Sequence, residues 1–161
     1  MDEEYRREYL EAHRRLLAAG YSHYEVSNYA LPGFEARHNR VYWEGGAYLG
    51  LGNSAHSFNP PLRRWNVRDW GAYQRACLQG EVPWEDGEIL GREELRLETL
   101  WLGLRTDRGI PLVELTPEGS EVVDRWVSEG YAYRVGGSVR LTPEGWLLMD
   151  QLVVELDGVQ G

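Results

Sequence analysis

The stretch that decides the fold runs from residue 24 to residue 58 and reads YEVSNYALPGFEARHNRVYWEGGAYLGLGNSAHSF. Its first residues complete a short strand that we expect over residues 21–28, with Tyr24 and Val26 as its apolar or aromatic positions. The glycines, prolines and asparagines between residues 30 and 61 predict irregular chain, interrupted by a short strand over residues 47–52. The centre of the protein is therefore expected to be aromatic and rich in loops.

On the N-terminal side, residues 2–19 predict a helix. Acidic residues crowd its first turn, and Gly20 stands where a C-terminal cap belongs. The apolar positions that recur at helical spacing are Tyr5, Tyr9, Ala12 and Leu16. A helix, a glycine and a strand in this order are typical of an α/β unit, but one strand makes no parallel sheet. We therefore expect the neighbouring strands of that sheet to lie elsewhere.

On the C-terminal side, the periodicity predicts a helix over residues 65–80 and a loop over residues 80–83. Residues 85–91 are acidic and polar, and we place a domain boundary there. The predicted domains are therefore residues 1–90 and residues 91–161.

The second domain reads as a regular unit. Residues 92–105 predict a helix with Leu95, Leu97, Leu100, Trp101 and Leu104 facing inward. The sequence Thr-Pro-Glu-Gly occurs at residues 116–119 and 142–145, and each copy predicts a capped helix start. Between them, residues 131–141 alternate around Gly136-Gly137 and predict a hairpin. Helix, helix, hairpin and helix in this order are typical of a winged-helix-like domain.

The composition excludes several kinds of site. The 17 basic residues among the 161 are all arginines, so there is no lysine for a Schiff base or a Walker A loop. Cys77 is the only cysteine, which excludes a disulfide within the chain and a cluster held by its own thiolates. No run is long and apolar enough to cross a membrane, and no secretory signal opens the sequence. We expect a soluble, cytoplasmic protein.

The charge disfavours nucleic acid as a partner. The net charge is −9, divided into −3 for residues 1–91 and −6 for residues 92–161. Nucleic-acid binding draws on a basic surface, because released counterions supply much of its free energy. The half of the chain that resembles a DNA-binding fold is thus the more acidic half, so we expect no nucleic acid.

Two motifs match familiar sites only superficially. Residues 50–55 fit the pattern G-x-G-x-x-A, but Pro60 and Pro61 follow too soon for the helix that a dinucleotide site needs. Ser54 resembles the serine of a nucleophile elbow, yet the second glycine of that motif is missing. Neither a Rossmann site nor a serine hydrolase is predicted.

Side chains with different binding properties lie close together in the seven-residue segment Arg37-His38-Asn39-Arg40-Val41-Tyr42-Trp43. A neutral histidine ring can ligate iron, and Tyr42 and Trp43 offer flat faces suited to a porphyrin. Arg37 and Arg40 are suited to propionates or phosphates. The alternative is a capped loop whose aromatic residues close one end of the core.

At this segment the sequence resembles a known family. The string from Tyr24 to Phe58 is similar to the post-cluster part of radical-SAM proteins of the coproporphyrinogen III oxidase-like family. Within it, His38-Asn39-x-x-Tyr42-Trp43 resembles the HNxxYW motif of HemW-type haem chaperones. The similarity continues through Arg64-Trp65-Asn66 and through Leu102-Gly103-Leu104-Arg105. Ala36 and Asn53 depart from the residues common in the family at their positions.

The resemblance implies a fold of class α/β plus α+β. Residues 1–90 would be the C-terminal part of a partial (β/α) radical-SAM barrel with the HNxxYW segment, and residues 91–161 a winged-helix-like domain. The family holds [4Fe–4S] and S-adenosylmethionine on a CxxxCxxC loop, which this sequence lacks. Those cofactors are expected only where an N-terminal half or a cluster-bearing partner chain is present, so we predict no catalytic residue in this chain alone.

The resemblance also implies site residues. His38 would be the metal ligand that binds haem iron, with Asn39, Tyr42 and Trp43 around it. Glu25 and Asn28 would lie at the end of the last barrel strand, which faces the cofactor in such barrels. His56, on the glycine-rich strand, would line the same cavity.

Three hypotheses follow. The first is a haem-binding portion of a haem chaperone that delivers haem to an acceptor haem protein. The second is the substrate-binding half of an oxygen-independent coproporphyrinogen oxidase, which would bind a porphyrinogen. The third is a protein-interaction module with no cofactor. Because the barrel elements would lack their neighbours, we expect residues 1–60 to be mobile, misassembled or engaged in a dimer when the chain is alone.

Overall fold

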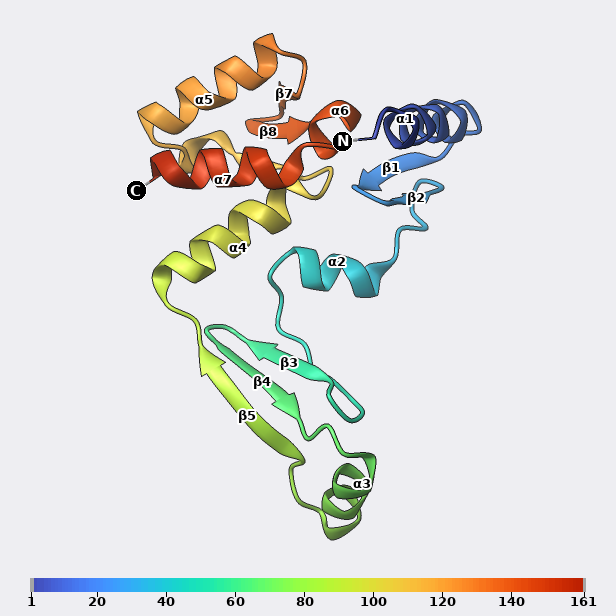
Figure 1. Ribbon diagram of the computed structural model, residues 1–161, viewed down its shortest axis with the longest axis vertical. Coiled ribbons are helices and arrows are strands. Elements are labelled where there is room, and N and C mark those ends of the chain that lie inside the picture. The colour runs from blue at the N-terminus through green and yellow to red at the C-terminus, as the bar shows by residue number, and fades with distance from the viewer. Residues whose placement is uncertain (1, 161) are drawn as a thin grey trace.

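The structure is a computed structural model that describes residues 2–160 (Figure 1). The α1 helix, the β1–β2 hairpin and the C-terminal elements lie together, whereas the β3–β4–β5 sheet and α3 extend away from them (Figure 1). In chain order the elements are α1 (Glu3–Ala18), β1 (Ser22–Glu25), β2 (Asn28–Ala30), α2 (Arg37–Trp43), β3 (His56–Asn59), β4 (Leu62–Asn66), α3 (Trp70–Gln79), β5 (Trp84–Ile89), α4 (Arg92–Leu104), β6 (Ile110–Pro111), the 3-10 helix η1 (Leu112–Glu114), α5 (Pro117–Ser128), β7 (Ala132–Val135), β8 (Ser138–Leu141), α6 (Pro143–Trp146) and α7 (Met149–Gln160).

The first helix is where the sequence predicts it. The Asp2 side chain caps α1 by accepting a hydrogen bond from the backbone N–H of Glu4, and Gly20 follows the helix at a φ of +87°. None of the α1 residues is fully buried, and Tyr5 is 57% exposed. Tyr9 is partly buried and packs against the core, so the helix contacts the core through one side chain.

The strand predicted over residues 21–28 is confirmed over its first half as β1, but the chain then turns and forms a hairpin with β2. β1 pairs antiparallel with β2, with Ser22 opposite Ala30. The turn is made by Glu25, whose Oε1 accepts hydrogen bonds from the backbone N–H and the hydroxyl of Ser27 and from the side-chain amide of Asn28. A carboxylate that binds its own neighbours reverses the chain in the way that aspartate and asparagine do in turns.

The irregular centre predicted over residues 30–61 contains a helix, α2, and the strand β3, which forms a hairpin with β4 just after it. Residues 34–44 contain neither glycine nor proline, so a helix of two turns forms inside a segment whose average composition predicts loops. The predicted strand over residues 47–52 is also wrong, because only Tyr48 pairs there, in an isolated bridge with Phe58.

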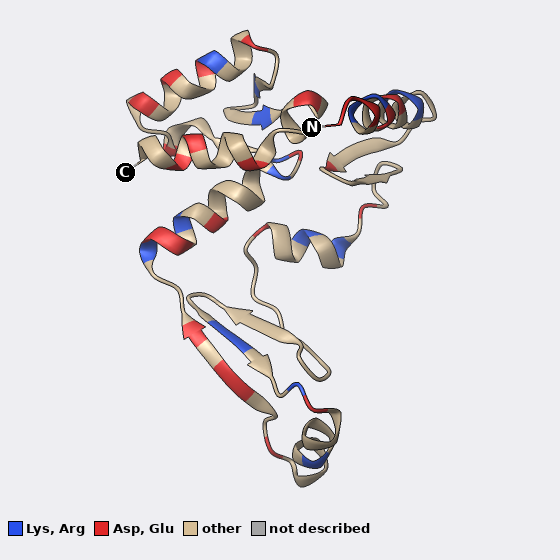
Figure 2. Ribbon diagram, in the orientation of Figure 1, with Lys and Arg blue, Asp and Glu red and all other residues tan. Residues whose placement is uncertain are grey.

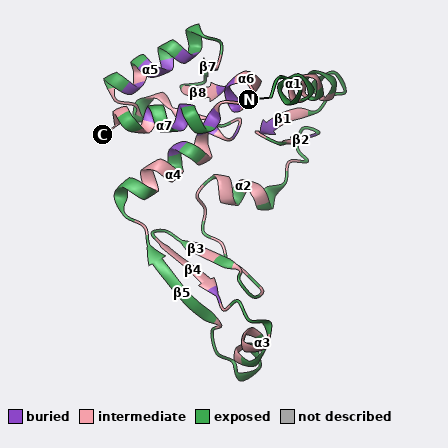
Figure 3. Ribbon diagram, in the orientation of Figure 1, coloured by how far each residue is buried: buried purple, intermediate pink, exposed green. Residues whose placement is uncertain are grey.

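A three-stranded antiparallel sheet, in the order β3–β4–β5, lies next along the chain, with α3 between β4 and β5. The helix predicted over residues 65–80 is confirmed as α3 but starts later, at Trp70, where Asp69 caps it, because Trp65 belongs to β4. Most of residues 85–91 form β5, whose six residues are all exposed (Figure 3), and the domain boundary placed there stays a prediction. The alternation of apolar and polar residues that predicts a strand is missing from β4 and β5, because arginines and acidic residues occupy several of their positions. These charged side chains pair across the strands, as Arg63 and Glu88 do.

The hydrophobic core belongs almost entirely to the C-terminal elements. β6, β8 and β7 form a second three-stranded antiparallel sheet, which α4 and α5 contact, and α7 packs on these two helices. The predicted caps at Thr116 and Thr142 are confirmed, as is the hairpin turn at Gly136-Gly137. The fully or nearly buried side chains are Leu100, Leu104, Ile110, Val122, Val123, Trp126, Ala132, Val139, Leu141, Trp146, Met149, Leu152, Val153 and Leu156. The helix predicted over residues 92–105 is confirmed as α4, but Trp101 was expected inside and is 44% exposed.

The acidic residues of this part are spread over its helices. Figure 2 shows acidic positions along α5 and α7 and on β5, with isolated arginines between them. Over residues 2–160 no helix combines the length and the apolar character that a membrane span requires.

Two histidines join the first helix to the hairpin. The Nδ1 atoms of His13 on α1 and His23 on β1 lie 2.9 Å apart, so they share one hydrogen. The His23 ring stacks on Tyr29 at 3.9 Å and meets the edge of Trp146 at 4.4 Å, both measured between ring centroids. Its Nε2 atom is buried without a hydrogen-bond partner among the described residues. This pair could not be predicted from the sequence, because its members are ten residues apart and on different elements.

Acid is expected to weaken the fold through these two histidines. Burial, and then the nearby His13, lowers the pKa of His23 to about 4, and burial also lowers the pKa of His13. The unfolded chain, with histidine pKa values near about 6.5, binds protons that the folded chain does not. This contribution to stability is complete above about pH 6.5 and is lost as the pH falls toward about 4.

Urea unfolding at about pH 7.5 and about pH 5 measures this effect in the wild type and in His23→Phe, which keeps the stacked ring but does not titrate. The variant should lose less free energy of unfolding on acidification than the wild type. Equal losses in both proteins would show that other groups cause the acid sensitivity.

Candidate functional site

The α2 helix carries the motif residues on an accessible surface. His38 and Tyr42 are four residues apart on it and therefore share one face. Their rings meet edge to face, with centroids 4.9 Å apart. The His38 side chain is exposed, and no described residue forms a hydrogen bond or an ion pair with it. Both ring nitrogens are therefore available to a ligand from outside the chain.

Aromatic and cationic contacts fix α2 in place. Tyr42 meets Tyr48 edge to face at 4.3 Å, and Trp43 lies 6.0 Å from Tyr24, both measured between ring centroids. The guanidinium of Arg105 lies 5.8 Å from the centroid of the Trp43 ring, and that of Arg40 lies 5.3 Å from the centroid of the Tyr24 ring. Cation–π contacts of this kind each stabilise by about 0.5–2 kcal/mol.

Glu25 is the most deeply buried charged residue of the site region, with 0% exposure. Its Oε1 binds Ser27 and Asn28, and its Oε2 lies 3.0 Å from a terminal nitrogen of Arg105. The carboxylate that was expected beside a cofactor thus has partners within the chain. The roles predicted for Glu25 and Asn28 in holding a cofactor stay predictions.

Backbone contacts reinforce the junction that Glu25 and Arg105 make. The backbone N–H of Val26 donates to the carbonyl of Arg105, and the backbone N–H of Asp107 donates to the carbonyl of Tyr24, each at 3.0 Å. The Arg40 side chain on α2 reaches Asp107 at 3.5 Å. The hairpin, α2 and the end of α4 are therefore linked to one another. Sequence reasoning did not identify Arg105, because its partner lies 80 residues earlier in the chain.

The other predicted site residues lie apart from this cluster or have no described polar contact. His56 is exposed on β3 with its ring 5.7 Å from that of Trp65, and none of the described contacts joins it to His38. Asn39 is half-buried on α2, and no hydrogen bond of its side chain is described. The structure therefore gathers His38, Tyr42 and Trp43 on one helix and leaves His56 on the sheet.

A cleft of about 600 Å³ opens beside α2. Tyr42 and Trp43 from the motif form part of its wall, and Trp101 on α4 forms another part. The remaining lining residues are Arg63, Leu90, Glu94, Leu97, Glu98, Leu102 and Arg105. This volume lies in the range of pockets that hold small organic ligands.

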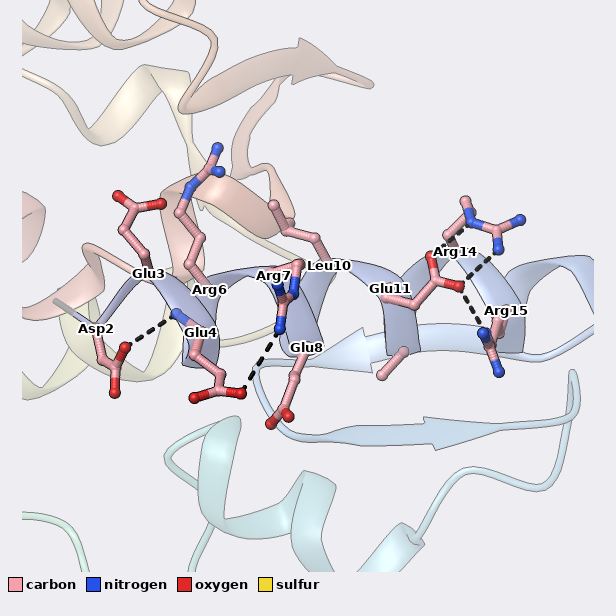
Figure 4. A pocket seen from close by; sticks show the side chains of 11 residues that line it. Asp2, Glu3, Glu4, Arg6, Arg7, Glu8, Leu10, Glu11, Arg14 and Arg15 are labelled. Atoms are coloured by element: carbon pink, nitrogen blue, oxygen red, sulfur yellow. Dashed lines mark hydrogen bonds and ion pairs between the residues drawn. The ribbon is translucent and has the colours of Figure 1, made fainter.

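A larger hollow lies elsewhere and is unsuited to such a ligand. It follows α1, and Figure 4 shows its charged side chains pointing to different sides of the helix, with Glu11 bound to Arg14 and Arg15. These are exposed pairs within one helix, which contribute little to stability. They do not converge on a common point.

Comparison with known proteins identifies relatives. No family model matches the chain. The haem chaperone HemW of Mycobacterium tuberculosis is 37% identical over 144 residues, which cover 89% of this chain and 37% of that protein. The haem chaperone HemW of Lactococcus lactis is 39% identical over 95 residues, which cover 59% of this chain and 24% of that protein. This chain thus matches little more than a third of the length of the Mycobacterium tuberculosis protein and about a quarter of the length of the Lactococcus lactis protein.

The fold also has a solved counterpart. The coproporphyrinogen III oxidase HemN of Escherichia coli, a radical-SAM enzyme, superposes with a TM-score of 0.60 over 92% of this chain and 39% of that protein. Sequence identity in this match is 17%, so the likeness concerns the fold.

Replacing Glu25 with Gln is expected to lower the free energy of unfolding by about 2–4 kcal/mol, because the Arg105 charge loses its buried partner. The Arg105 side chain is 30% exposed, so water compensates part of the loss. Urea unfolding measures the change, with Glu11→Gln on the exposed face of α1 as the control that should behave like the wild type. A Glu25→Gln protein as stable as the control would contradict the role given to this ion pair.

Proposed function

Because the chain belongs to the family of HemW- and HemN-like radical-SAM proteins, of which it corresponds to a C-terminal portion, we propose that it binds haem through His38 and passes it on to an acceptor protein. In this role haem is cargo, and no residue of this chain acts as a catalytic group. The names of the sequence relatives, which are haem chaperones, support the proposal.

One observation carries the proposal: the His38 ring is exposed on α2, with both nitrogens free of described partners, next to Tyr42. A porphyrin supplies four of the iron's ligands, so a single imidazole is enough to attach haem to the protein. Over residues 2–160 no three metal-ligating side chains converge, which fits a haem iron better than a metal ion held by protein alone.

An exposed ligand also suits delivery. Haem held at the surface of α2 keeps one face of its iron open to the side chain of an acceptor protein. The flat rings of Tyr42 and Trp43 would cover part of the macrocycle and shield it from water. Asn39 would flank this position, because it follows His38 on α2, whereas His56 on β3 would lie near it only if the haem extends beyond α2. The participation of both residues is part of the proposal.

The radical-SAM cofactors need residues that this sequence does not contain. Its one cysteine, Cys77, is exposed on α3, and a [4Fe–4S] cluster is normally held by several thiolates. A cluster and S-adenosylmethionine would therefore be bound outside these residues, in a further part of the protein or in a partner chain. We propose a cytoplasmic location, and for residues 91–161 a winged-helix-like domain whose acidic surface favours protein partners over nucleic acid.

Haem titration followed by visible absorption tests the function. The wild type should give a shifted Soret band that saturates at one equivalent, because one imidazole enters the coordination sphere of the iron. His38→Ala should lose this band or give a displaced one with affinity reduced by at least about tenfold, which corresponds to about 1.4 kcal/mol.

His56→Ala is the matched control, since His56 is also exposed but lies on β3. It should retain the shifted band, because a residue that lines the site without ligating the iron can change the affinity but leaves the imidazole ligand in place. Loss of the band in His56→Ala and its survival in His38→Ala would reverse the ligand assignment. Wild-type protein without any shifted band would contradict haem binding by this chain and favour the interaction module.

A further inference from the structure

We propose that the apolar edge of the haem lies in the cleft between α2 and α4, where Trp101 forms the wall opposite the motif. This inference rests on the proposed function and adds residues outside the HNxxYW motif to the haem site. It names Trp101 as the side chain that contacts the macrocycle from the far side of the cleft.

The cleft joins the proposed iron ligand through Tyr42. This residue lines the cleft, and its ring meets the His38 ring at 4.9 Å. His38 does not line the cleft itself, but it lies one helical turn before Tyr42 on the same face of α2. A flat ligand whose iron is bound to His38 would therefore extend into the space beside Tyr42 and Trp43.

The walls of the cleft suit an apolar edge rather than a charged one. Its two arginines already have acidic partners: Arg63 lies 2.6 Å from Glu98, and Arg105 pairs with Glu25. No free cation among the described lining residues remains to neutralise a propionate. The apolar walls are supplied by Leu90, Leu97, Trp101 and Leu102, together with the motif aromatics.

The propionates are then expected to point out of the cleft. Arg37, next to His38 on α2, is exposed and forms no ion pair among residues 2–160. A guanidinium with free donors is well suited to a carboxylate at the surface. This orientation places the charged edge of the haem in water and its methyl and vinyl edge between α2 and α4.

Trp101 is conspicuous on α4 because its environment differs from that of its neighbours. Leu100 and Leu104 are buried in the core at 5% and 0% exposure, whereas Trp101 is 44% exposed beside the cleft. A large ring left half in water gains burial when an apolar ligand covers it. Its removal should cost the folded protein little, because it contributes little to the core.

The experiment compares Trp101→Ala with Trp84→Ala in haem titrations of the chain. Trp84 is also 44% exposed, but it lies on β5 and is absent from the cleft lining. Trp101→Ala should weaken haem binding about tenfold, as truncation of a central aromatic contact often does, while Trp84→Ala binds as the wild type does. Trp101→Phe should restore most of the affinity, and thermal unfolding should show that all three variants remain folded.

Each outcome decides between the two claims. Unchanged affinity in Trp101→Ala, with normal binding by the wild type, overturns the cleft assignment and leaves haem binding through His38 intact. Equal weakening in Trp101→Ala and Trp84→Ala also overturns it, because the effect would then be independent of the cleft. Absence of haem binding in the wild type contradicts the proposed function itself.

Discussion

The ion pair between Glu25 and Arg105 is the interaction on which the arrangement of this chain depends. Glu25 has no exposed surface, and its carboxylate both shapes the turn of the β1–β2 hairpin and meets the guanidinium at the end of α4. A buried carboxylate without such partners would destabilise the fold, so the hairpin and the end of α4 must be in contact. Glu25 of the hairpin and Arg105 at the end of α4 are 80 residues apart in sequence, so this ion pair joins distant parts of the chain.

The same arginine connects this junction to the motif helix. Its guanidinium lies over the Trp43 ring, while Arg40 reaches back from α2 to Asp107 and the Tyr24 ring. These contacts set the distance between α2 and α4 and so create the cleft that both helices line. The position of α2, and with it that of His38, therefore depends on contacts with Arg105 and Asp107. Because both residues belong to the C-terminal part of the chain, which contributes the core, the proposed site depends on that part.

The sequence predicted the C-terminal elements well and the centre poorly, for physical reasons. Thr116 and Thr142 signal their helices through local capping, and the Gly136-Gly137 turn is equally local. By contrast, β5 and the helix α2 have weak local signals, because tertiary pairing decides the first and a short helix is marginal alone. The motif on α2 could be recognised from its residue types. Arg105 and Trp101 could not be assigned to the site in this way, because they approach the motif only in the folded chain.

The most direct test of the central claim is to map the haem on the protein by NMR. Ferric haem broadens amide signals near the iron, and a gallium porphyrin of the same shape provides the diamagnetic reference. The account predicts broadening centred on α2, with a weaker effect on the half of α4 that contains Trp101 and none on α5. Broadening centred on α5, on β5 or on α1, with α2 unaffected, would contradict it.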